Sequence, residues 1–154
     1  MGQSTDGQIC YGVMFEEDYE FPWDDEKYDG DIEDWWRDLC GYKPTNEIYS
    51  NGGYVGGVKP PESVFQAYYE ERRVFDKAHP IPFELVNYCS GDYPMYILAI
   101  TRTCLSNSRG TPEAFNPESL TITEDEKSNL LDFCAKHGLS FEGEPSWWLS
   151  SYWG

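Results

Sequence analysis

Segment 15–38 constrains the fold more than any other part of the chain, because acidic and aromatic side chains alternate along it. Between residues 16 and 38 it holds twelve carboxylates but only two cations, Lys27 and Arg37, in a chain of formal charge −17. Segment 15–38 also holds seven aromatic residues, six of them interleaved with these acids. Acidic linkers and disordered tails are poor in aromatic residues. The segment is therefore predicted to be a folded anionic surface.

Length and composition predict one globular domain. The chain has 154 residues, of which 40% are hydrophobic and 17% aromatic, and this is enough to bury a core. A sequence pI near 4.2 argues against direct binding to DNA, RNA or anionic membranes, because these partners need a cationic surface. The same charge favours rapid encounter with basic proteins.

The hydropathy pattern contains no run of 18 apolar residues, so no membrane span is expected. The first residues are polar and lack the basic-then-apolar order of a signal peptide. We therefore expect a cytoplasmic protein, monomeric or homodimeric, whose residues 1–7 are flexible.

Residues 31–40 carry the pattern of a short amphipathic helix. Apolar residues recur at i, i+3, i+4 and i+7 and form one stripe: Ile32, Trp35, Trp36 and Leu39. Asp31 stands at the N-cap position, and Gly41 follows the expected C-terminus. The same periodicity predicts a row of carboxylates on the solvent side: Asp31, Asp34 and Asp38.

The remaining pattern mixes strands and helices without a strict βαβ alternation. Two further helices are expected at 60–78 and from the Thr123–Glu126 capping box to Gly138. Strands are expected at 9–15, 47–49, 54–58, 83–88, 95–101 and 146–153, with a brief one at 120–122. Asn51-Gly52 is predicted to form a hairpin turn, and 104–117 a surface loop. The fold class is α+β: a single domain, residues 1–154, with a mainly antiparallel sheet of about four to six strands and about three helices.

The residues that usually carry catalysis or bind metals show no productive spacing. The five cysteines are scattered without a CxxC pair, so most are expected to be reduced and buried. His79 and His137 each lie near a predicted helix C-terminus, where the dipole favours a cation. A calcium loop aligned with Gly30 at its sixth position places Lys27 and Trp36 where oxygen ligands are needed. We expect no enzyme activity, no cofactor and no metal.

The acidic row has three readings. It is a solvated face, an irregular calcium site, or a mimic of a nucleic-acid backbone. Helical carboxylates three or four residues apart rise by about 5–6 Å, which is comparable to the phosphate spacing of a DNA strand once neighbouring loops contribute. Crowding so many like charges costs self-repulsion, which a chain tolerates more readily if the charges are used. The solvated face and the mimic remain the two main contenders.

A second cluster of aromatic residues lies at the C-terminus, where Trp147, Trp148 and Trp153 are joined by Tyr152. These side chains either pack onto the core or form an exposed interaction patch, for which Trp and Tyr are favoured. A third alternative is a hydrolase that uses two carboxylates among aromatic residues, as many glycosidases do. With 28 acidic residues in the chain, such a pair is expected by chance.

Several segments together resemble a family of small acidic proteins encoded by bacteriophages, to which no chemistry is assigned. They are 19–24 (YEFPWD), 56–61 (GGVKPP), 86–96 (VNYCSGDYPMY) and 149–154 (LSSYWG), and the resemblance extends over nearly the whole chain. Small acidic phage proteins often occupy the DNA-binding surface of a host enzyme. The resemblance therefore implies an inhibitor of a target such as DNA gyrase or another topoisomerase, a restriction enzyme, a CRISPR effector or a nucleoid protein.

Charge and resemblance together predict an inhibitor that acts in the cytoplasm of the bacterial host. Its partner is a basic host DNA-binding protein or enzyme, and it binds neither nucleic acid nor membranes directly. The predicted acidic surface is formed by Asp24, Asp25, Glu26, Asp29, Asp31, Glu33, Asp34 and Asp38. The alternative is an interaction module whose patch contains Trp147, Trp148 and Trp153.

Overall fold

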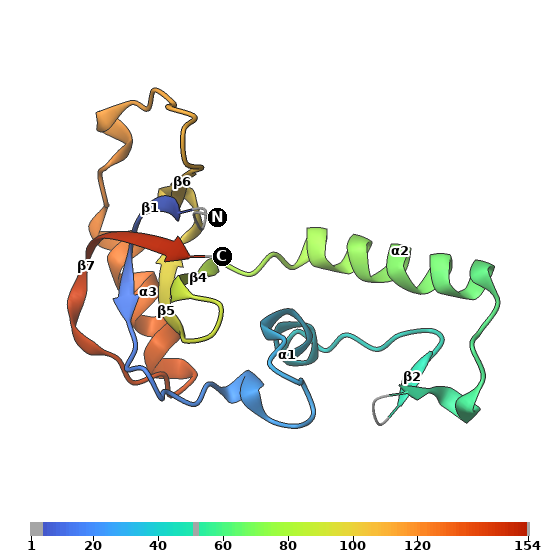
Figure 1. Ribbon diagram of the computed structural model, residues 1–154. Coiled ribbons are helices and arrows are strands. Elements are labelled where there is room, and N and C mark those ends of the chain that lie inside the picture. The colour runs from blue at the N-terminus through green and yellow to red at the C-terminus, as the bar shows by residue number, and fades with distance from the viewer. Residues whose placement is uncertain (1–4, 51–52, 154) are drawn as a thin grey trace. The chain divides into compact units, whose positions relative to one another are not determined.

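The computed structural model describes residues 5–50 and 53–153 (Figure 1). They form two compact units: the sheet unit, which joins Met1–Phe21 to Pro82–Gly154, and the helical unit, Pro22–Ile81. Three α-helices and a five-stranded, mostly antiparallel sheet confirm the predicted α+β class.

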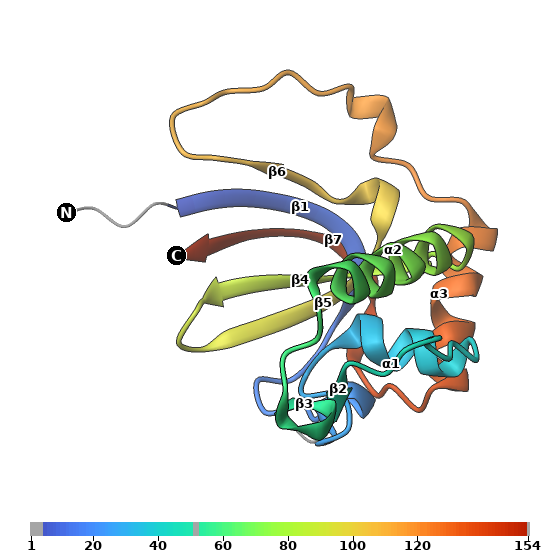
Figure 2. The same cartoon turned by 90° about the vertical axis from the view of Figure 1, so that its right-hand side faces the viewer.

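The sheet unit is built around its first strand, β1 (Thr5–Met14). This strand pairs along nearly its whole length with β7 (Glu142–Trp153). On its other side it pairs first with β6 (Leu105–Asn107) and then with β5 (Pro94–Ile100). β5 also pairs with β4 (Phe83–Ser90), and the end of β4 runs parallel to the end of β7. The pairings of β1, β5, β4 and β7 therefore close on themselves, and Figure 2 shows β1 between β6 and β7.

Close approach between β1 and β5 requires a glycine at position 12. A Cβ atom on Gly12 would lie 2.2 Å from the carbonyl oxygen of Leu98, which is far inside van der Waals contact. β5, whose sequence is almost continuously apolar, pairs on both sides. One face of the sheet buries an apolar cluster: Cys10, Val86, Ile97 and Ala99.

Helix α3 (Glu124–Lys136) packs beside the sheet, as Figures 1 and 2 both show. Its Phe133 ring meets the ring of Phe83 in β4 edge to face, at 4.9 Å between centroids. The predicted capping box is present: Thr123 Oγ1 accepts from the Glu126 backbone N–H, and the Glu126 carboxylate accepts from the Thr123 N–H.

The helical unit contains α1 (Ile32–Leu39), α2 (Glu62–Ala78) and a short hairpin of β2 (Tyr49–Ser50) and β3 (Gly53–Tyr54). One 3₁₀ turn, Pro22–Asp24, precedes α1, and another, Val55–Gly57, follows β3. The core of the helical unit contains Ile48, Phe65 and Tyr68. α2 begins after Pro61 and ends before His79-Pro80, as predicted, because proline cannot continue a helix.

Three local predictions were wrong. The second hairpin strand ends at Tyr54 instead of residue 58, because Gly56 and Gly57 turn the chain with φ of 71° and 70°. Residues 120–122 form no strand. The predicted loop 104–117 instead contains β6, three residues that pair with the distant β1.

Other expectations have mixed outcomes. Of the five cysteines, which are all free, only Cys10 and Cys134 are buried, whereas Cys89 is exposed. The turn residues 51–52 and residues 1–4 lie outside the described part of the chain, and residues 5–7 belong to β1.

Candidate functional site

Helix α1 forms where the apolar stripe predicted it. The Asp31 carboxylate accepts hydrogen bonds from the backbone N–H groups of Glu33 (2.7 Å) and Asp34 (3.1 Å), so it is the N-cap. Gly41 follows the helix with φ of 77°, a conformation that glycine adopts without strain. The apolar stripe is only partly buried, because Leu39 is 50% exposed.

Arg37 of α1 is buried, whereas Leu39, which was predicted to be buried, is exposed. The Arg37 side chain is 7% exposed and donates hydrogen bonds to three carboxylates: Asp76 (2.7 and 2.8 Å), Asp34 (2.6 Å) and Glu33 (2.9 Å). Arg72 of α2 also pairs with Asp34. Burial opposes the charge of Arg37, but these carboxylates outweigh it and raise the pKa of Arg37 above its usual value. We call Arg37, Arg72, Glu33, Asp34 and Asp76 the arginine cluster.

The third aspartate of the predicted row is paired as well. Asp38 accepts from Lys27 Nζ at 2.7 Å and from the Tyr28 hydroxyl at 2.8 Å. The Lys27 hydrogen bond, followed by that of Tyr28, lowers the pKa of Asp38. Asp31 thus caps the helix, and both Asp34 and Asp38 are neutralised by cations of the helical unit.

The other predicted site residues lie in the turn that precedes α1. Asp24, Asp25, Glu26 and Asp29 are exposed. Asp25 accepts from the Lys27 backbone N–H at 2.9 Å, and its carbonyl oxygen accepts from the N–H groups of Tyr28 and Asp29. Part of this group is therefore used to build the turn itself.

Four carboxylates of the sheet unit form a more exposed group, the acidic loop: Glu16, Glu17, Asp18 and Glu20. All four are exposed and follow β1 directly. Three rings hold the loop in place. Phe15, Tyr19 and Phe21 lie within 4.8–4.9 Å of one another between centroids, and Phe21 also meets Tyr96 of β5 at 5.6 Å. The interleaved aromatic residues thus anchor a folded anionic surface, as segment 15–38 predicted.

The Tyr19 hydroxyl ties the acidic loop to the end of α3. It accepts a hydrogen bond from the Ser140 N–H at 2.9 Å and donates one to the Gly138 carbonyl at 3.4 Å. The register of β1 and β7 then places Glu142 opposite Met14. Five carboxylates therefore gather at this end of the sheet, and within the described residues none of them has a Lys or Arg partner. Sequence spacing did not reveal Glu142, because it is more than 120 residues away from the loop.

The charge of the chain follows the same division. The sheet unit carries 15 carboxylates and 4 Lys or Arg residues, a formal charge of −11. The helical unit carries 13 and 7, a formal charge of −6. Although segment 22–38 looks like the most acidic part of the sequence, the larger unbalanced charge belongs to the sheet unit.

The C-terminal tryptophans have different environments. Trp148 is half-buried against the apolar cluster and its indole N–H donates to the Gly12 carbonyl at 2.9 Å. Trp147 packs edge to face on Tyr11 at 5.5 Å. Trp153 is 54% exposed, and its neighbour on the same strand, Leu149, is 84% exposed. Only the outer part of the predicted aromatic patch is therefore available to a partner.

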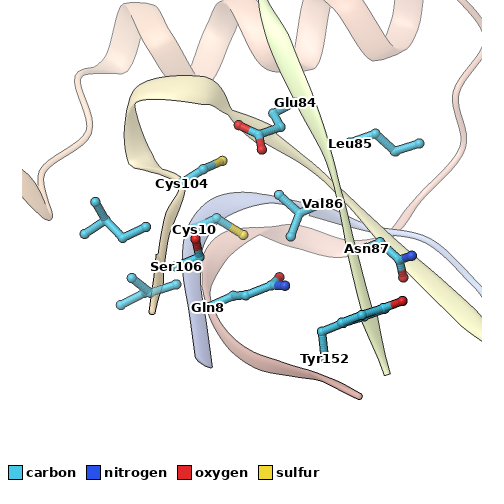
Figure 3. A pocket seen from close by; sticks show the side chains of 11 residues that line it. Gln8, Cys10, Glu84, Leu85, Val86, Asn87, Cys104, Ser106 and Tyr152 are labelled. Atoms are coloured by element: carbon cyan, nitrogen blue, oxygen red, sulfur yellow. The ribbon is translucent and has the colours of Figure 1, made fainter. Parts of the chain in front are cut away.

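A pocket of about 320 Å³ opens in the sheet unit, lined by residues of β1, β4 and β6 and by Tyr152 of β7 (Figure 3). Two thiols, Cys10 and Cys104, and the carboxylate of Glu84 share its wall. The buried side-chain oxygens of Gln8 and Asn87 have no hydrogen-bond partner among the described residues. No group of three or more His, Cys, Asp or Glu side chains in the described part of the chain is arranged to hold a metal ion.

Both histidines lie at helix C-termini, as predicted. His79 caps α2, where its ring stacks on Phe75 and its Nδ1 lies 3.1 Å from the Phe75 carbonyl oxygen. His137 caps α3, where burial and then Lys136 lower its pKa. The expected stabilisation of a cation does not hold for His137, because desolvation favours its neutral form.

Comparisons with protein-family models, with curated proteins and with solved structures found no match for this chain. Within residues 5–50 and 53–153, no helix combines the length and the apolar character needed to cross a membrane.

Proposed function

We propose that this protein inhibits a basic DNA-binding protein or enzyme of a bacterial host by placing carboxylates where DNA phosphates would bind. The acidic loop carries the proposal. It presents four exposed carboxylates within five residues, joined by Glu142 and without a cationic partner in the described residues. In this proposal the protein catalyses no reaction and acts by occupying the DNA-binding surface of its partner.

The way the loop is held supports this function. Three aromatic rings and two hydrogen bonds of Tyr19 fix the backbone from which the carboxylates project. A partner then binds charges that are already ordered, which reduces the entropy lost on association. Keeping unpaired carboxylates together costs self-repulsion, which a basic partner would relieve.

The resemblance to small acidic phage proteins favours the same class of partner. The acidic residues of the helical unit that were predicted to bind the partner make a smaller contribution in this proposal. Asp34 and Asp38 already have cationic partners, whereas Glu26 and Asp29 are exposed in the turn before α1. We therefore assign the main contact to the acidic loop and a secondary one to the exposed turn.

The test is competition with DNA for purified host proteins. Labelled duplex DNA is bound to DNA gyrase holoenzyme, to a nucleoid protein and to a restriction enzyme, and displacement is followed by fluorescence anisotropy. At 50 mM salt we expect displacement from at least one of them, and at 300 mM salt a loss of at least about tenfold in potency because the charges are screened.

Two variants locate the surface. Neutralising the acidic loop (E16Q/E17Q/D18N/E20Q) should reduce displacement at least about tenfold, because several charge contacts are lost together. Neutralising α1 (D31N/D34N/D38N) is the matched control and should change it much less. Failure to displace DNA from all three proteins at 50 mM salt would overturn the proposal, and equal effects of the two variants would overturn the choice of surface.

Leu149 and Trp153 favour a second candidate, an interaction module that uses apolar contacts. Both side chains are more than half exposed on β7. Binding through this patch should survive 300 mM salt and should be lost in a L149S/W153S variant, because buried apolar and aromatic groups carry such interfaces. A salt-sensitive interaction that tolerates L149S/W153S would rule this candidate out.

A further inference from the structure

Cys10 and Cys104 come together although 93 residues separate them in the sequence. The antiparallel ladder of β1 and β6 ends at the pair Ile9 and Leu105, so the next two residues toward β5 are Cys10 and Cys104. The two segments stay side by side beyond that point, because the Tyr11 N–H donates to Thr103 Oγ1 at 2.9 Å. Residues directly opposite in antiparallel strands have Cα atoms about 4.5–5.5 Å apart, which is within the range that a disulfide requires.

Both sulfur atoms lie on the same side of their segments. Figure 3 shows Cys10 and Cys104 on the wall of the 320 Å³ pocket, with the Cys104 side chain directed toward Glu84. Cys10 is 1% exposed within the apolar cluster, and the half-buried Cys104 packs against the same cluster. The pocket therefore gives small molecules a route to a pair of thiols that bulk solvent otherwise reaches poorly.

The two thiols differ in acidity because of their contacts. A hydrogen bond with Cys104 lowers the pKa of Cys10, so this sulfur is the better nucleophile. The same hydrogen bond, burial and the Glu84 carboxylate raise the pKa of Cys104. Two thiols this close together form an arrangement in which Cys10 reacts first and Cys104 resolves the product.

We propose that Cys10 and Cys104 are a site of oxidative modification that hydrogen peroxide converts into a disulfide. The pocket suits this oxidant, because the unpartnered oxygens of Gln8 and Asn87 are acceptors for the two O–H groups of peroxide. The inference is independent of the proposed inhibitor function.

The reaction balances with peroxide as the only oxidant. The Cys10 thiolate attacks one oxygen, the O–O bond breaks, and the second oxygen leaves as hydroxide and takes up a proton to become water. Cys10 is then a sulfenic acid. The Cys104 sulfur, after losing its proton, attacks the Cys10 sulfur and displaces hydroxide, which becomes the second water. Two thiols and one peroxide yield one disulfide and two waters.

The remaining cysteines can be excluded from this reaction by burial or by substitution. Cys134 is buried in α3, where burial raises its pKa to about 11, so it holds little thiolate. Cys40 belongs to the helical unit, and Cys89 is an exposed residue at the end of β4. A C40S/C89S background removes these two without touching the pocket.

The test is peptide mapping of the C40S/C89S protein after peroxide treatment. Remaining thiols are blocked with N-ethylmaleimide, and the protein is digested with trypsin without reductant. We expect peptides 1–27 and 103–109 to appear as one linked species that is about 2 Da lighter than their sum and that reductant separates. The thiol pair should also bind phenylarsine oxide, which needs two neighbouring thiols, and C104S should abolish both results.

A linked species that forms with diamide but not with peroxide would overturn the assignment of peroxide. Absence of the link with both oxidants, while the circular dichroism spectrum remains native, would overturn the site itself. Glu84 supplies a further check. E84Q removes a charge that disfavours both thiolates, so it should speed disulfide formation at least about twofold, whereas E142Q, whose residue does not line the pocket, should not.

Discussion

The arginine cluster and the acidic loop both derive from one acidic stretch of sequence, yet the fold treats their charges in opposite ways. In the helical unit, Arg37 and Arg72 form ion pairs with three carboxylates. In the sheet unit, the acidic loop and Glu142 have no cationic partner within the described residues. The acids of the cluster stabilise structure, whereas those of the loop remain available for binding.

This difference shows that the density of charged residues along a sequence does not predict where an anionic surface lies. The most regular feature, the aspartates of α1, belongs to the unit of charge −6. The irregular loop, which has no periodicity, belongs to the unit of charge −11. What separates the two is the placement of a few arginines, and substitutions at these positions test the contrast.

Removing Arg37 should have the largest effect. R37M leaves Glu33, Asp34 and Asp76 without their shared donor and should lower the unfolding free energy of the helical unit by about 3 kcal/mol, at the low end for a broken buried pair because the carboxylates are partly solvated. Urea titration combined with hydrogen exchange of the α1 and α2 amides measures this unit directly.

Arg73 provides the matched control on the same helix. Its side chain is 69% exposed and pairs with Glu70 alone, so R73M should cost less than about 0.5 kcal/mol. Equal losses in R37M and R73M would show that the arginine cluster does not hold the helical unit together.

The next largest effect concerns Glu126, the one carboxylate of the sheet unit with a guanidinium partner among the described residues. Arg102, and then the Thr123 backbone N–H, lower the pKa of Glu126 to about 2. Its folded pKa lies below the unfolded value, so the stability it contributes is present above about pH 4.3 and is lost as the pH falls toward 2. E126Q should therefore be less stable than the native protein at pH 7 and equally stable near pH 2.

Thermal unfolding between pH 2 and 7 measures this convergence. D132N, which removes an exposed carboxylate from the same helix, should not reproduce it. A constant difference between E126Q and the native protein across this range would contradict the assigned ion pair.

Two substitutions of Asp31 distinguish the capping function of its side chain from the effect of its charge. D31A removes the acceptor for two backbone N–H groups and should cost about 1 kcal/mol in the helical unit, whereas D31N keeps a capping oxygen and should cost only a few tenths. Both variants lose the charge, so equal losses would mean that the carboxylate acts through its charge. Urea titration at two salt concentrations checks the result.

Much of the fold could be predicted from local patterns. The stop of α2 before Pro80, the capping box of Thr123 and Glu126, and the cap of α1 depend on neighbours within four residues, and all three are present. β6 was not predicted because its three residues are too few to show a strand pattern in the sequence. They form a strand only because they pair with β1. The same holds for Cys10 and Cys104, which the ladder alone brings together.

The candidate site was predictable in composition but not in geometry. Helical periodicity correctly placed Asp34 and Asp38 on α1, but it could not show that Arg72 of α2 pairs with Asp34 and that Asp76 of α2 pairs with Arg37. In the same way, no spacing linked Glu142 to the acidic loop. Ion pairs between elements that are distant in sequence decide whether a carboxylate is free. Such pairs cannot be predicted from the residue spacing of a single sequence.

The smallest expected effect has the opposite sign and therefore contrasts the two regions most directly. Neutralising the acidic loop with E16Q/E17Q/D18N/E20Q removes repulsion and breaks no ion pair in the described structure, so it should raise the stability of the sheet unit by about 0.5 kcal/mol at low salt. At 1 M salt the gain should vanish, because the screening length falls to about 3 Å. D34N, which removes one charge from the arginine cluster, should lower stability under both conditions. If neutralising the loop also destabilised the protein, its carboxylates would have structural partners, and the reason to assign them to a binding partner would be gone.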